Sequence, residues 1–100
     1  RGGIGDLTEQ SLPEDVEQEI LRIAESVGGI KEPHNLRTRR IGSHYAIQLH
    51  LLMDGDLPLR QVHDKESRVE ELLRKSYGEQ TYIIVHAEPI ENKKDEVMSK

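Results

Sequence analysis

The sequence contains no cysteine, and this absence removes two classes of structure. A disulfide framework needs paired cysteines, and a closed structural zinc site of the cysteine type needs cysteine thiolates, so both are excluded. Phenylalanine and tryptophan are also missing. Apolar residues make up only 34% of the 100 residues. We therefore expect a single domain with a small core of isoleucine, leucine and valine.

Long hydrophobic runs and an excess of basic residues are missing as well. No stretch approaches the roughly 18 apolar residues of a membrane helix, and no signal-peptide pattern is present. The formal net charge of −5 argues against a nucleic-acid-binding surface, which normally needs a basic stripe. The chain opens on Arg1-Gly2-Gly3 rather than on methionine, so we expect a fragment of a longer protein.

The spacing of apolar residues predicts a first helix. Residues 1–12 are glycine-rich and polar and are typical of a linker. Ser11 and Glu14 have the spacing of a capping box, with Pro13 tolerated in the first turn. Gly28-Gly29 would end the helix. Its apolar stripe is Val16, Ile20, Ile23, Ala24 and Val27.

Two strands, a second helix and a third strand are predicted to follow. Their approximate ranges are 35–41, 45–53, 58–77 and 81–88, with turns at Gly42-Ser43 and Asp54-Gly55-Asp56. The order α-β-β-α-β predicts an α/β domain of truncated ferredoxin-like architecture, with two helices on one face of a three-stranded mixed sheet. A right-handed crossover would make the last two strands parallel. The folded domain is expected over residues 13–90, with a disordered charged tail at 91–100.

Four of the five histidines fall where predicted elements begin, end or alternate. His50 lies on the strand face opposite Ile47, Leu49 and Leu51, while His86 shares a strand face with Glu88 two positions later. Imidazole nitrogen and carboxylate oxygen are common ligands of divalent metals when thiolates are absent. The pattern predicts a metal site that gathers ligands at one end of the sheet. The candidate ligands are His34, His50, His63, His86 and Glu88.

Each candidate also has an explanation without metal. A sheet histidine such as His50 can be half-buried with a satisfied hydrogen bond, and a helix histidine such as His63 can simply be exposed. His34 can be a loop residue and Glu88 a solvated strand end. It is the convergence of several such residues on one end of a small fold that favours the metal site. His44, beside the hairpin turn, is assigned no function.

Three arginines, Arg37, Arg39 and Arg40, form a basic cluster in this acidic chain. We expect them to lie on a solvated strand and to form salt bridges with acidic helix residues. The alternative is that they pair across a dimer or with another domain.

Three separate motifs resemble the cation diffusion facilitator family. Residues 34–42 carry the pattern H-x-L-R-x-R-x-x-G, residues 57–63 resemble a helix-start motif that ends in histidine, and residues 83–89 resemble the closing strand V-x-I-H-x-(D/E)-P. Residues 7–13 are similar to the segment that leads out of the last membrane helix. The resemblance extends over residues 7–90, with the motifs in the family's order and spacing.

This resemblance implies the cytosolic C-terminal domain of a proton-coupled exporter of divalent metals, at the cytoplasmic face of a membrane. In that family the domain is metallochaperone-like and not an enzyme, and it pairs into a V-shaped homodimer. Metal bound in and between the two copies closes the V and favours transport. The implied partners are a second copy, the transporter's own transmembrane domain and divalent metal ions, with no nucleic acid.

The resemblance also implies roles for the five candidate ligands. A carboxylate at the position of Glu88 can bridge two zinc ions, one held also by His34 and His50 and the other by His63 and His86. The best-known zinc-binding pattern has aspartate where this chain has Glu88. The resemblance to zinc-binding members makes zinc the expected metal, and the departure at Glu88 leaves Mn²⁺, Fe²⁺, Cd²⁺ and Co²⁺ as alternatives.

Three other functions compete with metal sensing. One is a metal-free structural dimerisation domain of the same transporter. Another is a ferredoxin-like module that senses a small molecule, although the chain has no glycine-rich phosphate loop. The third is a zinc hydrolase that would use Glu88 as base, but the chain has no H-E-x-x-H segment.

Overall fold

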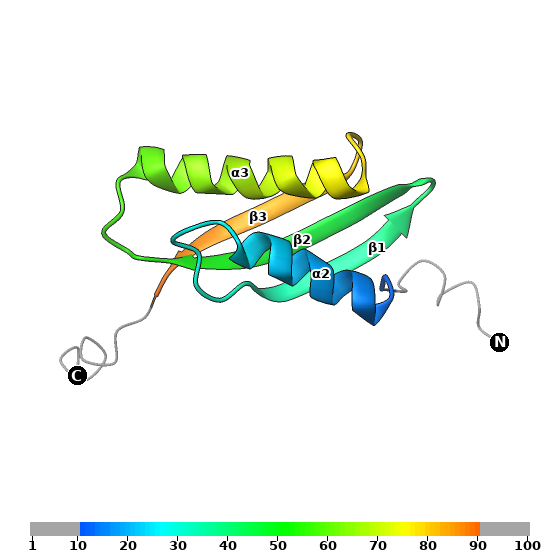
Figure 1. Ribbon diagram of the computed structural model, residues 1–100, viewed down its shortest axis with the longest axis horizontal. Helices are drawn as coiled ribbons and strands as arrows, with labels where there is room; N and C mark the ends of the chain where they lie inside the picture. Colours follow the sequence, from blue (N-terminus) through cyan, green and yellow to red (C-terminus); the bar gives the residue numbers. More distant parts are fainter. Residues whose placement is uncertain (1–10, 91–100) are drawn as a thin grey trace.

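The computed structural model describes residues 11–90 and confirms the predicted order of elements (Figure 1). The residues predicted as linker and disordered tail lie outside the described part, except for the last two linker positions, Ser11 and Leu12. The elements are α2 (Glu14–Glu25), β1 (His34–Ile41), β2 (His44–Met53), α3 (Leu59–Tyr77) and β3 (Tyr82–Pro89).

The three strands form one mixed sheet in the order β1-β2-β3. β1 and β2 are antiparallel and are joined by a tight turn, in which Gly42 has a φ of 61° that glycine adopts without steric cost. β2 and β3 are parallel, and α3 makes the crossover between them. Both helices lie on the same face of the sheet (Figure 1). The predicted truncated ferredoxin-like architecture is confirmed.

The core lies between this helix-covered face and the two helices. Side chains alternate along β2, so every second residue points into the core and the others point to the opposite face, which no described element covers. We call this opposite face the open face of the sheet. The fully buried side chains of the core are Ile20, Ile47, Leu49, Leu51, Met53, Val69 and Leu73.

The predicted capping box between Ser11 and Glu14 is wrong. Pro13 occupies the N-cap position of α2, and no side chain caps the helix. A different interaction ties this end of α2 to the sheet. The backbone N–H of Leu12 donates to the Thr38 hydroxyl at 3.0 Å, and that hydroxyl donates to the Glu17 carboxylate. Leu12, expected in the linker, is buried in the core.

Truncation of the central strand is expected to destabilise the domain strongly. Leu49 is 0% exposed, so Leu49→Ala should lower the free energy of unfolding by about 2–5 kcal/mol, because burial is lost and a cavity remains. Leu59→Ala is the matched control, since Leu59 is 83% exposed and its loss should change stability by less than about 0.5 kcal/mol. Urea unfolding would measure both. Equal losses would contradict this placement of the core.

Candidate metal centre

Three histidines form a row across the open face of the sheet. His50 on the central strand is paired in register with His34 on β1 and with His86 on β3. The ring centroids are 5.4 Å apart for His34 and His50 and 4.9 Å apart for His50 and His86. Strand pairing therefore brings together imidazoles that are far apart in the sequence.

Glu88 places a carboxylate beside this row. Its Oε2 lies 2.5 Å from His50 Nδ1, and its Oε1 lies 3.4 Å from His34 Nε2. Glu88 and the two histidines each offer one ligand atom, and these atoms all lie within 4.8 Å of one another. The side chain of His50 is 22% exposed and that of Glu88 is 39% exposed. An ion could therefore reach this cluster of His34, His50 and Glu88 directly from solvent.

The histidines hold the pKa of Glu88 below its ordinary value of 4.5. The largest cause is the hydrogen bond to His50, which favours the ionised carboxylate. Partial desolvation acts in the opposite direction, while the nearby charges of His50 and His34 lower the pKa further. The cluster thus holds a carboxylate in the ionised form that a metal ligand requires.

The backbone orients the ring of His34. Its Nδ1 lies 2.9 Å from the carbonyl oxygen of Glu32, and because a carbonyl can only accept, Nδ1 must carry the proton. In the neutral ring, Nε2 then holds the lone pair and faces Glu88. Metal-bound histidines are commonly oriented by such a bond from the second ring nitrogen. The residue types of the cluster, two imidazoles and a carboxylate, fit a divalent ion of borderline hardness.

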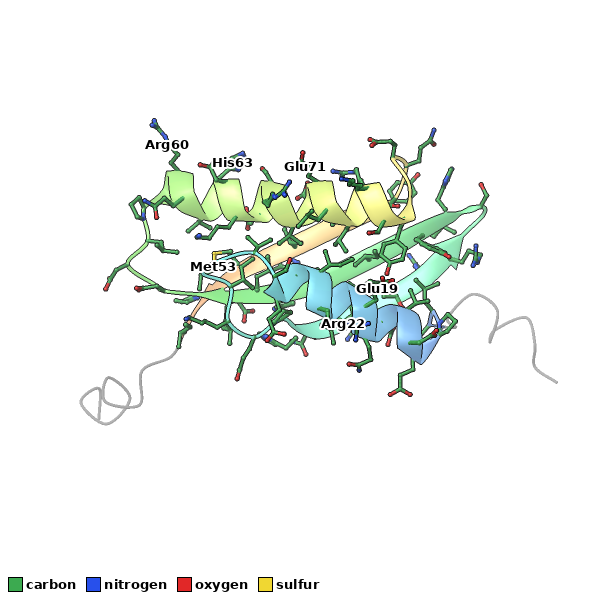
Figure 2. All side chains as sticks on the ribbon, viewed as in Figure 1. Glu19, Arg22, Met53, Arg60, His63 and Glu71 are labelled. Atoms are coloured by element: carbon green, nitrogen blue, oxygen red, sulfur yellow. The ribbon has the colours of Figure 1, made fainter. Side chains whose placement is uncertain are left out.

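The structure gathers three of the five predicted ligands into one cluster. His86 packs against His50, but it is not among the clustered ligand atoms. His63 lies on α3, where it is exposed and points away from the body of the domain (Figure 2). One copy of the chain therefore does not assemble the predicted second ligand set of His63, His86 and Glu88.

The salt bridges expected for the arginine cluster are not found within residues 11–90. The guanidinium of Arg40 instead lies 4.9 Å from the centroid of the Tyr45 ring, a cation–π contact. Tyr45 in turn packs edge-on against Tyr77. The hydroxyl of Tyr77 donates to Glu19 at 2.6 Å, and burial together with this bond raises the pKa of Tyr77.

Two features that position His34 were not predicted from the sequence. One is the Glu32 carbonyl, which no side-chain pattern could reveal. The other is Asn35, which has a φ of 53° in the left-handed region. Asparagine enters this region more readily than most residues, so its presence beside a predicted strand start was the available signal.

The fold and the cluster together define a small α/β domain with the ligand types of a divalent-metal site. Residues 12–90 match the family described as the cytoplasmic domain of cation efflux proteins, and the chain belongs to this family. This confirms the family resemblance that the motifs indicated. The family is a transporter domain and not an enzyme family.

The chain is similar to curated cation-efflux pumps named FieF. It is 40% identical over 84 residues to the pump of Escherichia fergusonii and equally identical to that of Serratia proteamaculans. Each match covers 83% of this chain but only 27% of the pump. The chain therefore spans about a quarter of the length of these relatives.

Solved structures of related domains share the fold. The Zn form of CzrB is 27% identical, with a TM-score of 0.72 over 80% of this chain and 91% of that chain. The nickel form of MamM CTD E289H is 22% identical, with a TM-score of 0.71 over 79% of this chain and 100% of that one. At this lower identity the second likeness shows the fold alone.

Removal of His50 is expected to raise the pKa of Glu88 in metal-free protein, because the hydrogen bond that favours the carboxylate is lost. Carbon-13 NMR of the glutamate carboxyl groups would follow the titration in His50→Ala. His63→Ala is the matched control, since His63 lies outside the cluster, and it should leave the titration of Glu88 unchanged. No difference between the two variants would contradict the bond.

The lowered pKa also has a consequence for stability. A carboxyl group whose pKa is lower in the folded state adds stability above its ordinary pKa, and that contribution is lost as the pH falls through the lowered value. The metal-free wild type should therefore lose stability more steeply than Glu88→Gln in acid below about pH 4.5, as urea unfolding at several pH values would show.

Proposed function

We propose that this chain is the metal-sensing, dimerising regulatory domain of a proton-coupled divalent-cation efflux transporter, and that zinc is its metal. The observation that carries the proposal is the cluster of His34, His50 and Glu88 on the open face of the sheet. Family membership supports it, since the relatives are cation-efflux pumps about four times as long as the matched segment.

The remainder of the transporter would supply the membrane path. No helix among residues 11–90 has the length and apolar character needed to span a bilayer. Because the matched family is described as the cytoplasmic domain of cation efflux proteins, we assign transport to a separate transmembrane domain and assign the described domain to the cytoplasmic face. The partners of the domain are that transmembrane domain, a second copy of the chain and divalent ions.

Zinc is proposed because imidazole suits it well and the solved relative CzrB is in a Zn form. Manganese, iron, cadmium and cobalt ions remain alternatives, because Glu88 also supplies the oxygen ligand that harder ions prefer. His34, His50 and Glu88 would hold one ion. His86 would help to hold a second ion. His63 lies away from the open face of the sheet, so it could reach that second ion only from the other copy of the chain (Figure 2).

The described contacts indicate how metal would bias the dimer. Without metal, a hydrogen bond between His50 and Glu88 joins the two side chains. A dication would take the place of that proton, neutralise carboxylate charge in a chain of net charge −5, and link ligands from the two copies. A ligand shifts a conformational equilibrium only by its differential affinity for the two states, and a tenfold shift needs about 1.4 kcal/mol.

A metal-free dimerisation domain is the second candidate. Two observations favour it. The His50–Glu88 pair is already satisfied by its own hydrogen bond, and the open face exposes the apolar residues Ile41, Tyr82 and Ile84. A second copy could cover these residues without any ion.

Zinc titration calorimetry would test the metal site. The wild type should bind zinc, and His50→Ala and Glu88→Ala should each weaken binding by more than about tenfold, because even changes to residues outside the ligand shell cost roughly 10–100-fold. His44→Ala is the matched control, since His44 lies at the hairpin end of β2, and it should bind like the wild type. Equal affinity in all four proteins would exclude this cluster as the site.

Small-angle scattering would test the conformational role. Zinc should reduce the radius of gyration of the dimer near pH 7.5, and the effect should disappear near pH 5.5, because histidines must be neutral to bind and their ordinary pKa is about 6.5. His50→Ala should not respond at either pH. Scattering that zinc leaves unchanged, in a protein shown to bind it, would support the metal-free dimerisation domain instead.

A further inference from the structure

We propose that Asn35 is a positioning residue, whose left-handed backbone turns His34 onto the open face of the sheet and so completes the ligand cluster. The inference rests on the proposed metal site and adds a residue to it. It is carried by the strand register, by the backbone angle of Asn35 and by the contacts of His34.

The register of β1 against β2 contains one extra residue. Arg37 lies opposite Gln48 in the ladder, and the next pair along the strands is His34 and His50. β1 therefore advances by three residues where β2 advances by two. This irregularity is a β-bulge, and it lies between His34 and Arg37.

Without the bulge, His34 would face the wrong way. Side chains two apart in a strand share a face, and both Leu36 and Thr38 point toward the helices, where Thr38 is buried and Leu36 packs against the core. Regular alternation would place His34 with them, opposite Leu51. A shift of one residue moves a side chain to the other face, and the bulge supplies that shift.

Asn35 is the residue that makes the bulge possible. Its φ of 53° is the only positive value at a non-glycine position within the described residues 11–90. The left-handed region is unfavourable for residues with a Cβ, and most so for β-branched residues, whereas asparagine tolerates it. The two contacts of His34 depend on the resulting orientation: Nδ1 bonds to the Glu32 carbonyl at 2.9 Å, and Nε2 faces Glu88 at 3.4 Å.

Substitutions at position 35 distinguish the effect of the backbone conformation on zinc binding from the effect of the amide side chain. Asn35→Val should weaken zinc binding by about five- to thirtyfold, the range that corresponds to the energetic penalty of a left-handed residue. Asn35→Gly should bind within about twofold of the wild type, because glycine adopts this conformation freely. Arg37→Val is the matched control, since it adds the same side chain to the regular part of β1 and should not alter affinity.

Calorimetry on the intact chain would measure these affinities, with thermal unfolding of each variant beside it. If Asn35→Val does not fold, Asn35→Ala takes its place, with an expected loss near fivefold. Two results would overturn the inference. One is wild-type affinity in the valine or alanine variant, and the other is an equal loss in Asn35→Gly, which would assign the effect to the amide side chain.

A measurement without metal distinguishes failure of this inference from failure of the proposed function. In metal-free protein, NMR should detect through-space contacts between the His34 and His50 rings, whose centroids lie 5.4 Å apart. The contacts should persist in Asn35→Gly and vanish in Asn35→Val. If the wild type binds no zinc but the ring contacts respond to the two substitutions in this way, the proposed metal function is wrong and the positioning role of Asn35 is supported. Persistence of the contacts in Asn35→Val would overturn the positioning role.

Discussion

Alternation along β2 is the constraint on which the rest of the structure depends. The central strand sends Ile47, Leu49, Leu51 and Met53 into the core and leaves His50 on the open face. The same alternation therefore separates the side chains that form the core from the side chain that belongs to the candidate metal centre. Because the core is small and strands on both sides pair with β2, any change in its register would disturb stability and ligand geometry together.

The ligand cluster combines groups with very different sequence separations. His50 and Glu88 are 38 positions apart and meet because parallel pairing with β3 aligns the ends of both strands. His34 joins them from the other neighbouring strand. The open face thus already holds a hydrogen-bonded, partly exposed arrangement, in which a proton occupies the place that a cation would take. Both proposals start from this arrangement: in metal sensing a cation would replace the proton, whereas in metal-free dimerisation the hydrogen bond between His50 and Glu88 would remain.

Much of this arrangement could be predicted from the sequence. The alternation of apolar residues in 45–53 and the glycines that follow both helices predict the order of the elements. The alternation of side chains along each strand also places His50, His86 and Glu88 on one face of the sheet. Regular alternation gives the wrong face for His34, because the bulge at Asn35 depends on a backbone angle that composition does not reveal. The predicted capping box failed because the N-cap of α2 is Pro13, two residues after Ser11. His63 was expected to reach the same end of the sheet, but the rotation of α3 about its axis directs it outward.

The parallel pairing of β2 with β3 has a consequence for how the chain folds. The β1–β2 hairpin joins strands through a two-residue turn, whereas β3 can pair with β2 only after the intervening α3 has crossed the sheet. Contacts between distant residues close late because loop closure must precede them. We therefore expect the contact between Glu88 and His50 to form later in folding than the β1–β2 hairpin. An ion that needs both side chains would bind only completed domains, and it would slow their unfolding rather than speed their formation.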